Sequence, residues 1–293
     1  MVSAGEYSRI YDPSVGEAER WYVNDHTVFR DREGTWHLIG ITHAEPMNPF
    51  DELDLCHATA PALLGPWTRQ PHCLSTDRAA GETHLWAPHV LDHDGRYWMF
   101  VCAGGVAPDE YRIHLAMSDD CSHWERSPAN PLVVDGYEAR DPMVLRVGDR
   151  WVMYYTATSA AAGGHHVVVA AESDDLLVWS GRRVVFESPL VGTGAGPTES
   201  PFVVERDGRW YLFIGPDYGP LMASIEAGKV DMSRYRTTTV YESDDPFSFQ
   251  REVGRIASHA AEVVVDEAGA WWVTHCGWGQ GGVWLAPLHW DDE

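Results

Sequence analysis

The chain has 293 residues, of which 44% are hydrophobic. This proportion is enough for a large buried core and argues against a disordered chain. Its 21 lysine and arginine residues against 44 aspartate and glutamate residues give a formal net charge of −23. This charge argues against nucleic acid or an anionic membrane surface as a partner. A neutral or cationic small molecule, or an uncharged polymer, fits it better, and the simplest interpretation is an acidic, soluble surface.

The N-terminal segment lacks a basic stretch followed by an apolar stretch, which is the pattern of a secretory signal. No apolar run approaches the roughly 18 residues that a membrane helix needs. We therefore expect a cytoplasmic protein, unless a leader has been removed, and no membrane partner. The five cysteines are scattered without C-x-x-C spacing, which argues against a zinc site or a disulfide framework and predicts reduced, buried thiols.

A hairpin pattern recurs five times along the chain and carries most of the information on the fold. Each copy has an apolar run, a polar turn with a glycine, an aromatic residue and a second apolar run, as β-hairpins do. The copies span residues 24–40, 87–101, 140–155, 199–214 and 261–275. Their turn glycines are 53 to 61 residues apart, namely Gly34, Gly95, Gly148, Gly208 and Gly269.

A second, weaker unit follows several of these hairpins. It consists of a strand, a Ser-Asp-Asp turn and an aromatic residue, at 116–124, 171–179 and 241–249, with a degenerate version at 56–67. Two hairpins per repeat make a four-stranded antiparallel sheet, and five such sheets close radially into a five-bladed β-propeller around a central funnel. We predict an all-β, single-domain chain over 1–293, in which about 20 N-terminal residues form an extension or close a blade. A β-sandwich with accidental internal similarity is the alternative.

In a propeller the first strand of each blade lines the central channel, so the residues just before these strands should meet around one funnel. Aligned on the repeat, these positions hold Asp25, Trp86, Asp141, Glu199 and His259. A proline suits the first residue of a strand because that residue needs no N–H for pairing. Prolines stand at the matching positions of three repeats, Pro88, Pro142 and Pro201.

Three of the five positions, Asp25, Asp141 and Glu199, are carboxylates, and Arg140 is a counter-charge beside the second of them. Carboxylates that share a concave, partly dehydrated place raise one another's pKa. Glycoside hydrolysis uses one carboxyl to protonate the leaving oxygen and another to attack the anomeric carbon or to activate water. The three residues therefore predict a glycosidase site.

Other residues near the funnel are candidates for substrate contact. An indole face stacks well on the C–H face of a sugar, which makes Trp86 a subsite candidate, although a place in the core is equally compatible with its pattern. The expected substrate-binding residues are Arg140, Trp86, His26, His84, His259 and Trp278. Most of the other tryptophans are predicted to pack between blades, among them Trp36, Trp151, Trp210 and Trp271.

These motifs resemble those of the five-bladed-propeller glycoside hydrolases, the superfamily that holds families 32, 68, 43 and 62. The stretch WYVNDHTVFRDREGTWHLIG (21–40) resembles the family 32 opening phrase Trp-x-Asn-Asp-Pro-Asn-Gly, EARDPMV (138–144) carries its Arg-Asp-Pro, and TESPFVV (198–204) resembles its Glu-Cys-Pro. The resemblance covers roughly residues 20–290. It implies a retaining, β-fructofuranosidase-like enzyme for terminal or short furanosides, with Asp25 as nucleophile, Asp141 as transition-state stabiliser and Glu199 as acid/base. Arg140 would help Asp141 hold sugar hydroxyls.

Several positions depart from the family 32 pattern. His26 and Thr27 replace Pro and Asn after Asp25, and Ser200 replaces Cys. The stretch HLWAPHV (84–90) is closer to the Trp-Ala-Pro phrase of family 43. That resemblance implies an alternative, an inverting α-L-arabinofuranosidase or β-xylosidase that uses the same three carboxylates as general base, pKa modulator and general acid. His259 resembles a channel histidine that binds calcium or its water shell in many family 43 enzymes, so a structural calcium stays open, while no cofactor is required.

Two further functions are compatible with the pattern. A retaining site can pass the sugar to another sugar instead of to water. A non-catalytic propeller that binds carbohydrate is an alternative of another class, because a propeller fold alone does not imply catalysis. A binding module has no need for three funnel carboxylates, so the residues favour an enzyme whose partner is an oligosaccharide or a small glycoside.

Overall fold

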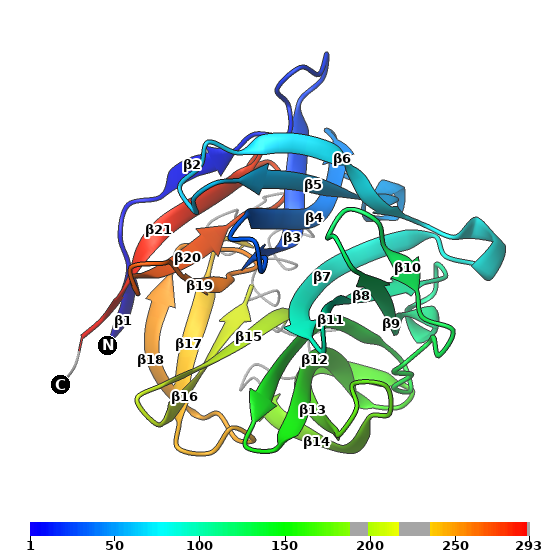
Figure 1. Ribbon diagram of the computed structural model, residues 1–293. Coiled ribbons are helices and arrows are strands. Elements are labelled where there is room, and N and C mark those ends of the chain that lie inside the picture. Colours follow the sequence, from blue (N-terminus) through cyan, green and yellow to red (C-terminus); the bar gives the residue numbers. More distant parts are fainter. Residues whose placement is uncertain (188–198, 217–234, 292–293) are drawn as a thin grey trace, which may run out of the picture.

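The computed structural model describes residues 1–187, 199–216 and 235–291, and it is an all-β propeller of five antiparallel sheets arranged around a centre (Figure 1). The predicted fold is confirmed. Blades one to four each run from an innermost strand outwards in chain order, as consecutive antiparallel neighbours do when short turns connect them. Within the described ranges, no helix is long and apolar enough to span a membrane.

The strands of the blades have the following bounds. Blade one contains β3 (Trp21–Arg30), β4 (Trp36–Ala44), β5 (Asp54–Ala60) and β6 (Thr68–Ser75), and blade two contains β7 (His84–His93), β8 (Arg96–Gly104), β9 (Arg112–Ser118) and β10 (Glu125–Arg126). Blade three contains β11 (Ala139–Val147), β12 (Arg150–Ala160), β13 (Gly163–Ser173) and β14 (Ser180–Glu187). Blade four contains β15 (Glu199–Arg206), β16 (Arg209–Gly215), β17 (Thr238–Ser243) and β18 (Arg251–Ile256). Blade five contains β19 (Val263–Val265), β20 (Trp271–His275), β21 (Val283–Trp290), β1 (Val2–Ala4) and β2 (Ser8–Tyr11). Three short 3-10 turns are η1 (Pro49–Asp51), η2 (Arg78–Ala80) and η3 (Pro108–Glu110).

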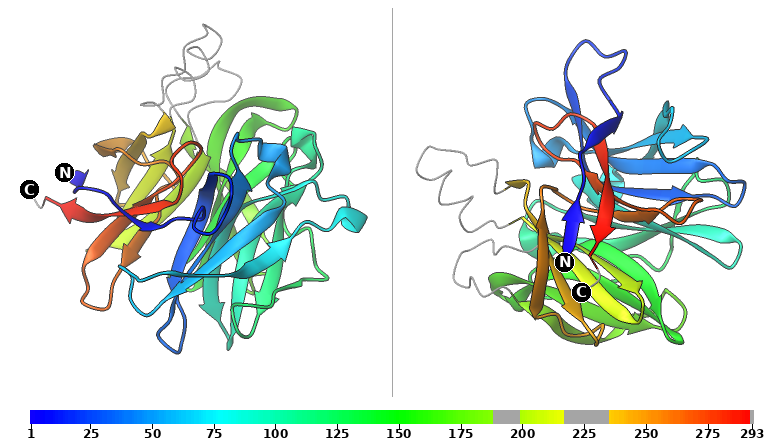
Figure 2. Two further views of the ribbon diagram at one scale, coloured as in Figure 1. Left: turned by 90° about the horizontal axis from the view of Figure 1, so that it is seen from above. Right: turned by 90° about the vertical axis from the view of Figure 1, so that its left-hand side faces the viewer.

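The N-terminal segment closes the ring. Both β1 and β2 pair antiparallel with β21, with Val2 opposite Trp290 and Ser8 opposite Leu285. The two chain ends consequently lie side by side in all views (Figures 1 and 2), and the Met1 amino group donates to the Asp291 carbonyl at 2.8 Å. Because the first and last strands share one sheet, the ring has no open seam between its first and last blades.

The hydrophobic core consists of five clusters, one between each pair of adjacent blades. Blades five and one share the cluster that contains Trp36, and blades three and four share the cluster against which Trp210 packs. Trp151 and Trp271 pack against the clusters of their own blade boundaries. The prediction that these repeat-position tryptophans pack between sheets is confirmed. The consequence is a stiff ring whose inner edge is free to carry polar side chains.

The innermost strands are bulged at the level of the predicted site. Their pairing shifts register between Asn24 and His26 in β3, between Trp86 and His89 in β7, and at the corresponding places of β11 and β15. The prolines lie at these bulges, inside the strands, since β7 begins at His84 and Pro88 is its fifth residue. The expectation that they begin the strands was therefore wrong. A bulge leaves a residue unpaired, so a proline without an N–H is tolerated there.

The bulges also correct the alignment of the repeats. Four non-glycine residues at this level have a positive φ, namely Ala87 (47°), Asp141 (56°) and Ser200 (51°) at the bulges and Ala260 (48°) just before β19. These four are the equivalent positions, so Asp141 corresponds to Ser200 and not to Glu199, which lies one residue earlier. Left-handed backbone costs about 1–2 kcal/mol for a residue with a Cβ, and such strain is found where a strand has to re-aim its side chains.

Candidate active site

A pocket of about 390 Å³ lies at the inner edge of the blades. Its lining includes all three predicted carboxylates, Asp25 from β3, Asp141 from β11 and Glu199 from β15. Trp86 of β7 and Trp278, from the connection between β20 and β21, add aromatic surface. The fold thus brings together side chains from all five blades, and the prediction that the three carboxylates share one place agrees with this geometry.

Arg140 joins the carboxylates of two blades. Its Nη1 lies 2.5 Å from Asp141 Oδ2 and 3.1 Å from Glu199 Oε2, and its Nε lies 3.3 Å from Glu138 Oε1. Its side chain is only 12% exposed, so these ion pairs are poorly screened by solvent. A buried arginine among three carboxylates fixes their positions and offsets their mutual repulsion.

Ser200 connects the third carboxylate to the others. Its hydroxyl donates a short hydrogen bond to Asp25 Oδ1, and its backbone N–H donates to Asp141 Oδ2 at 3.0 Å. The positive φ of Ser200 allows its hydroxyl and its N–H to serve two carboxylates from different blades. Thr156 adds a donor to Asp141 Oδ2 at 3.3 Å. Asp25, Asp141 and Glu199 therefore form one hydrogen-bonded unit through Arg140 and Ser200.

Burial raises the pKa of both aspartates in this unit. For Asp25, the hydrogen bond from Ser200 and the charge of Arg140 lower the pKa in part. For Asp141, the charge of Arg140 lowers the pKa in part, and the negative charge of Asp25 raises it further. Two carboxyls that repel each other in a buried place tend to hold a proton between them. This arrangement is suited to acid/base work near neutral pH.

Glu138 and His166 line the same pocket and were not predicted. His166 Nε2 lies 2.6 Å from Glu138 Oε1. Burial raises the pKa of Glu138, but Arg140 and His166 outweigh it, and the result is a pKa of about 2. A signal existed in the sequence, because Glu138 and Arg140 are two residues apart, and alternate residues of a strand face the same side.

Glu52 is a further unpredicted carboxyl in this pocket. It follows the η1 turn, and its Oε1 accepts hydrogen bonds from Tyr22 and Trp278. Burial raises its pKa to about 8, although the hydrogen bonds from Trp278 and Tyr22 lower it in part. Glu52 belongs to a connection between β4 and β5 that does not repeat from blade to blade, so the sequence contained no signal for it.

The predicted substrate-binding residues divide into two groups. Arg140, Trp86 and Trp278 line the pocket. His26, His84 and His259 do not line it and are buried beside it. This is a correction to their expected place, and their contacts show what each does instead.

Two of the three buried histidines, His84 and His259, contact residues that line the pocket, and His26 contacts Cys276. The ring of His84 stacks on Trp86 at 3.7 Å between centroids, and His26 Nδ1 lies 3.2 Å from Cys276 Sγ. His259 Nε2 lies 3.0 Å from Asn24 Oδ1, and its ring stacks on Tyr235. Burial lowers the pKa of His26 and of His259 to about 3, so both rings are neutral at physiological pH. In the part of the chain that the structure describes, no group of three His, Cys, Asp or Glu residues is arranged to hold a metal ion.

Below the pocket the channel narrows to a space of about 30 Å³, lined by Asp25, Asp141, Glu262 and the bulge prolines. This space is too small for a sugar ring. Substrate therefore has to approach the carboxylates from the 390 Å³ side.

All five cysteines are free thiols, and four of them are buried.

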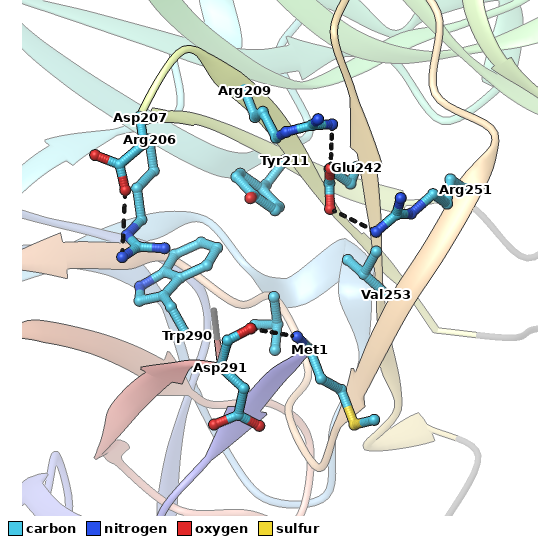
Figure 3. A pocket seen from close by; sticks show the side chains of 11 residues that line it. Met1, Arg206, Asp207, Arg209, Tyr211, Glu242, Arg251, Val253, Trp290 and Asp291 are labelled. Carbon is cyan, nitrogen blue, oxygen red and sulfur yellow. Dashed lines mark hydrogen bonds and ion pairs between the residues drawn. The ribbon is translucent and has the colours of Figure 1, made fainter. Parts of the chain in front are cut away.

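A second pocket, of about 340 Å³, lies between blade four and the closing strands of blade five (Figure 3). Its arginines are paired with carboxylates. Arg209 and Arg251 both contact Glu242, at 2.5 Å and 3.4 Å, and Arg206 lies 3.3 Å from Asp207. The cations Arg206, Arg209, Arg251 and the Met1 amino group face Asp207, Glu242 and Asp291, so most of the positive charge of this pocket is neutralised. The pocket lies at the Arg206 end of β15, whereas Glu199 lies at the opposite end of that strand.

Comparisons with solved structures place the fold among glycoside hydrolases. A thermostable family 43 glycoside hydrolase is 16% identical with a TM-score of 0.70, over 94% of this chain and 93% of that chain. A family 43 β-xylosidase/α-arabinofuranosidase from a compost microbial metagenome, in complex with xylotriose, is 14% identical with a TM-score of 0.67, over 99% and 94%. A family 32 β-fructofuranosidase from Bombyx mori is 16% identical with a TM-score of 0.65, and the match covers 92% of this chain but 61% of that chain. No curated protein sequence matches this chain.

Identities this low show a shared fold and do not choose between families 32 and 43. The family model distinguishes them. The model of the N-terminal domain of glycosyl hydrolases family 32 matches residues 17–206, which is more than half of the chain and includes Asp25, Arg140, Asp141 and Glu199. The chain therefore belongs to glycoside hydrolase family 32.

Proposed function

We propose that the protein hydrolyses terminal or short furanosides in the 390 Å³ pocket with retention of anomeric configuration, as a β-fructofuranosidase does. Asp25 attacks the anomeric carbon, and Glu199 protonates the leaving oxygen and then removes a proton from water. Asp141 hydrogen-bonds sugar hydroxyls and stabilises the developing charge. These roles follow the general scheme of a retaining glycosidase, in which one carboxylate attacks while a second gives and takes a proton.

One observation carries this proposal. Carboxylates from three different blades are linked into one unit by Arg140, which contacts Asp141 and Glu199, and by Ser200, which contacts Asp25 and Asp141. Burying ionisable groups together costs free energy, and a protein without a chemical use for them has no reason to retain that cost. A non-catalytic binding propeller would be served better by neutral polar groups.

The charge of the pocket favours an uncharged substrate. Its lining contains the carboxyls Asp25, Glu138, Asp141 and Glu199, against Arg140 and His166, in addition to Glu52, whose raised pKa favours its neutral form. A sugar with a phosphate or a carboxylate would enter a place where negative charge already dominates, and repulsion there is poorly screened. Neutral oligosaccharides and small glycosides fit this pocket.

A second candidate is an inverting α-L-arabinofuranosidase or β-xylosidase. The observation in its favour is the full-length similarity in fold to family 43 enzymes, one of which was solved with xylotriose. The Trp86-Ala87-Pro88 stretch lies in the pocket wall and the narrow space below it, as part of the bulge of β7. The two candidates share the pocket and the carboxylates and differ in the role of Asp25, which would activate water in the inverting enzyme.

The experiment is a hydrolysis screen with matched variants. The purified chain is incubated with sucrose, short fructans, nitrophenyl arabinofuranosides and nitrophenyl xylosides. We expect release of fructose from a fructoside, and a loss of turnover of several orders of magnitude in Asp25→Asn and Glu199→Gln with unchanged circular dichroism. Hydrolysis of arabinosides or xylosides alone would favour the second candidate. Unchanged turnover in either variant, or no hydrolysis of any glycoside, would contradict the proposal.

A further inference from the structure

Glu52 occupies a position in the pocket that the mechanism above does not use. It lies at the C-terminal end of the η1 turn, and only 1% of its surface is exposed. Both hydrogen bonds that it accepts end on the same oxygen, because Tyr22 Oη donates to Oε1 at 2.8 Å and Trp278 Nε1 donates to Oε1 at 3.1 Å. Tyr22 comes from β3 and Trp278 from the connection that follows β20, so the carboxyl is fixed from two blades.

The second oxygen of Glu52 faces a different environment. Both hydrogen bonds from Tyr22 and Trp278 leave Oε2 aside, the side chain lines the 390 Å³ pocket, and the Trp86 indole, which also lines the pocket, is a further donor to the carboxyl. A carboxyl has hydrogen-bonding capacity on both of its oxygens, and Tyr22 and Trp278 use only Oε1. At the wall of a ligand pocket, the remaining capacity is a position that a ligand can satisfy.

The surroundings of Glu52 favour its neutral, protonated form. No cation is among the groups that shift the pKa of its carboxyl, and the nearby negative charge of Asp25 raises this pKa further, in addition to the effect of burial. Cys276 and Tyr22 also face it, and burial raises the pKa of both. Oε1 accepts one O–H donor, from Tyr22, and one N–H donor, from Trp278. In the protonated carboxyl this oxygen therefore acts as the carbonyl, and the proton resides on Oε2.

The remaining charged groups of the pocket come from other blades. They are the carboxyls Glu138, Asp141 and Glu199, and the basic groups Arg140 and His166. Arg140 is committed to the three carboxyls that it contacts, and His166 is paired with Glu138. Neither basic group is paired with Glu52, so the pocket presents one neutral acid among several charged ones.

We propose that Glu52 is a specificity-determining residue whose Oε2–H donates a hydrogen bond to an oxygen of an uncharged sugar bound in this pocket. This inference rests on the proposed function, because it concerns the same pocket and the same class of ligand. A neutral carboxyl can donate where an ionised one can only accept, so sugar binding requires Glu52 to keep its proton. Glutamine is the matched replacement, since its carbonyl can accept from Tyr22 and Trp278 while its amide N–H₂ takes the place of Oε2–H.

The proposal predicts a specific pH dependence of sugar affinity. With the pKa of Glu52 at about 8, roughly nine-tenths of the molecules lack the donor at pH 9, and the apparent affinity falls about tenfold relative to pH 6. A glutamine at this position does not titrate, so its affinity stays constant over the same range. Tyr22 donates to Oε1 and lowers the pKa of Glu52, so Tyr22→Phe should move the fall in affinity to higher pH.

The test measures binding of sucrose, and of xylotriose as the second probe, by titration calorimetry between pH 6 and pH 9. All proteins carry Glu199→Gln so that the sugar is not consumed, and folding is checked by circular dichroism at each pH. The matched control is Glu262→Gln, because Glu262 is also buried with a raised pKa but lines the narrow space below the pocket.

Between pH 6 and pH 9 we expect the sugar affinity to fall about tenfold in the Glu199→Gln parent and in the Glu262→Gln control. With Glu52→Gln the affinity should fall less than twofold over the same interval. With Tyr22→Phe the midpoint of the fall in affinity should shift to higher pH. The Tyr22→Phe arm keeps the test decisive if Glu52→Gln does not fold. A fall that is the same with and without Glu52, or a midpoint that does not move in Tyr22→Phe, would overturn the role of Glu52 and leave the proposed function intact. Absence of binding of either sugar at any pH, together with absence of hydrolysis by the wild type, would overturn both.

Discussion

Arg140 of blade three lies 3.1 Å from Glu199 of blade four, measured from Nη1 to Oε2. The same Nη1 lies 2.5 Å from Asp141 Oδ2, so one guanidinium holds two of the three carboxylates on which the proposed mechanism depends. Positions that are 59 residues apart in the sequence become one unit because the innermost strands of neighbouring blades, β11 and β15, contact each other.

Removal of this guanidinium should abolish most of the activity. We expect Arg140→Met to lower kcat/KM by about 10²–10⁴-fold, because Asp141 and Glu199 would lose their counter-charge in a place that solvent screens poorly. Arg140→Lys should recover only a small part, since an ammonium cannot reproduce the planar fork of donors. Steady-state kinetics on the best substrate of the screen measure both effects.

The control for this prediction is Arg96→Met. Arg96 also forms an ion pair, with Asp119 at 2.8 Å, but on the surface, so its loss should leave kcat/KM within about twofold. If Arg140→Met kept wild-type kcat/KM, the guanidinium would have no part in the reaction.

The two proposed catalytic carboxyls can be told apart by the leaving group. Glu199→Ala should hydrolyse natural glycosides at least about 10³-fold more slowly, yet react well in its first step with a glycoside whose leaving group needs no protonation, such as a nitrophenolate. Asp25→Ala should be slow with both, because no covalent intermediate can form. Added azide should give a glycosyl azide of retained configuration in Glu199→Ala, where it attacks the covalent intermediate, and of inverted configuration in Asp25→Ala, where it attacks the substrate directly. The same azide product and the same leaving-group dependence in both variants would contradict the assignment of these roles.

The buried histidines should make the fold sensitive to acid. Burial lowers the pKa of His89 to about 4 from an unfolded value of 6.5, while its Nε2 hydrogen-bonds the Val144 carbonyl at 2.9 Å. Between these two pH values the unfolded chain takes up a proton that the folded chain does not, so the free energy of unfolding falls as the pH falls from 6.5 to 4. The loss is at most about 3 kcal/mol for this residue. Urea unfolding at pH 7 and at pH 4.5 should therefore show a smaller pH effect in His89→Gln than in the wild type.

A pH dependence in His89→Gln as steep as in the wild type would contradict this prediction, because it would show that folding does not lower the pKa of His89.

The residues with a positive φ offer a test of the strained backbone. Ala260, just before β19, has a φ of 48°, whereas Ala116 lies in the regular strand β9. Glycine adopts positive φ without penalty but weakens a regular strand, and both alanines lose a buried methyl group. Ala260→Gly should therefore cost at least about 1 kcal/mol less unfolding free energy than Ala116→Gly. Equal costs in urea titrations at one pH would mean that Ala260 is not strained.

Much of the fold could be predicted because it repeats. Glycine turns and aromatic residues recur in each blade, and the tryptophans of these repeats pack between sheets as their pattern indicates. The phrases around Asp25, Asp141 and Glu199 also recur, so their convergence followed from the ring itself. The exact alignment of the repeats could not be predicted, because a bulge adds one residue to a strand without a clear change in its composition. As a result, Asp141 is equivalent to Ser200 and not to Glu199.

The rest of the site depends on connections that do not repeat. Glu52 follows a 3-10 turn between two strands, and Tyr22 and Trp278 reach it from separate blades. A contact of this kind cannot be predicted from the periodicity of the sequence, because it does not repeat from blade to blade. His26 follows the pocket residue Asp25 in the chain, and the alternation of a strand turns it to the other side. His84 is two residues from Trp86, and its ring is buried by stacking on Trp86.

The central claim is that Asp25 forms a bond to the sugar and that retention follows. The direct measurement is hydrolysis of the best furanoside substrate in water that contains methanol, with the products identified by NMR spectroscopy. A retaining enzyme transfers the sugar to methanol as well as to water, and the methyl glycoside does not change its anomeric form afterwards. The account predicts a methyl furanoside with the anomeric configuration of the substrate. Free sugar released with inverted configuration, and no methyl glycoside of retained configuration, would contradict it.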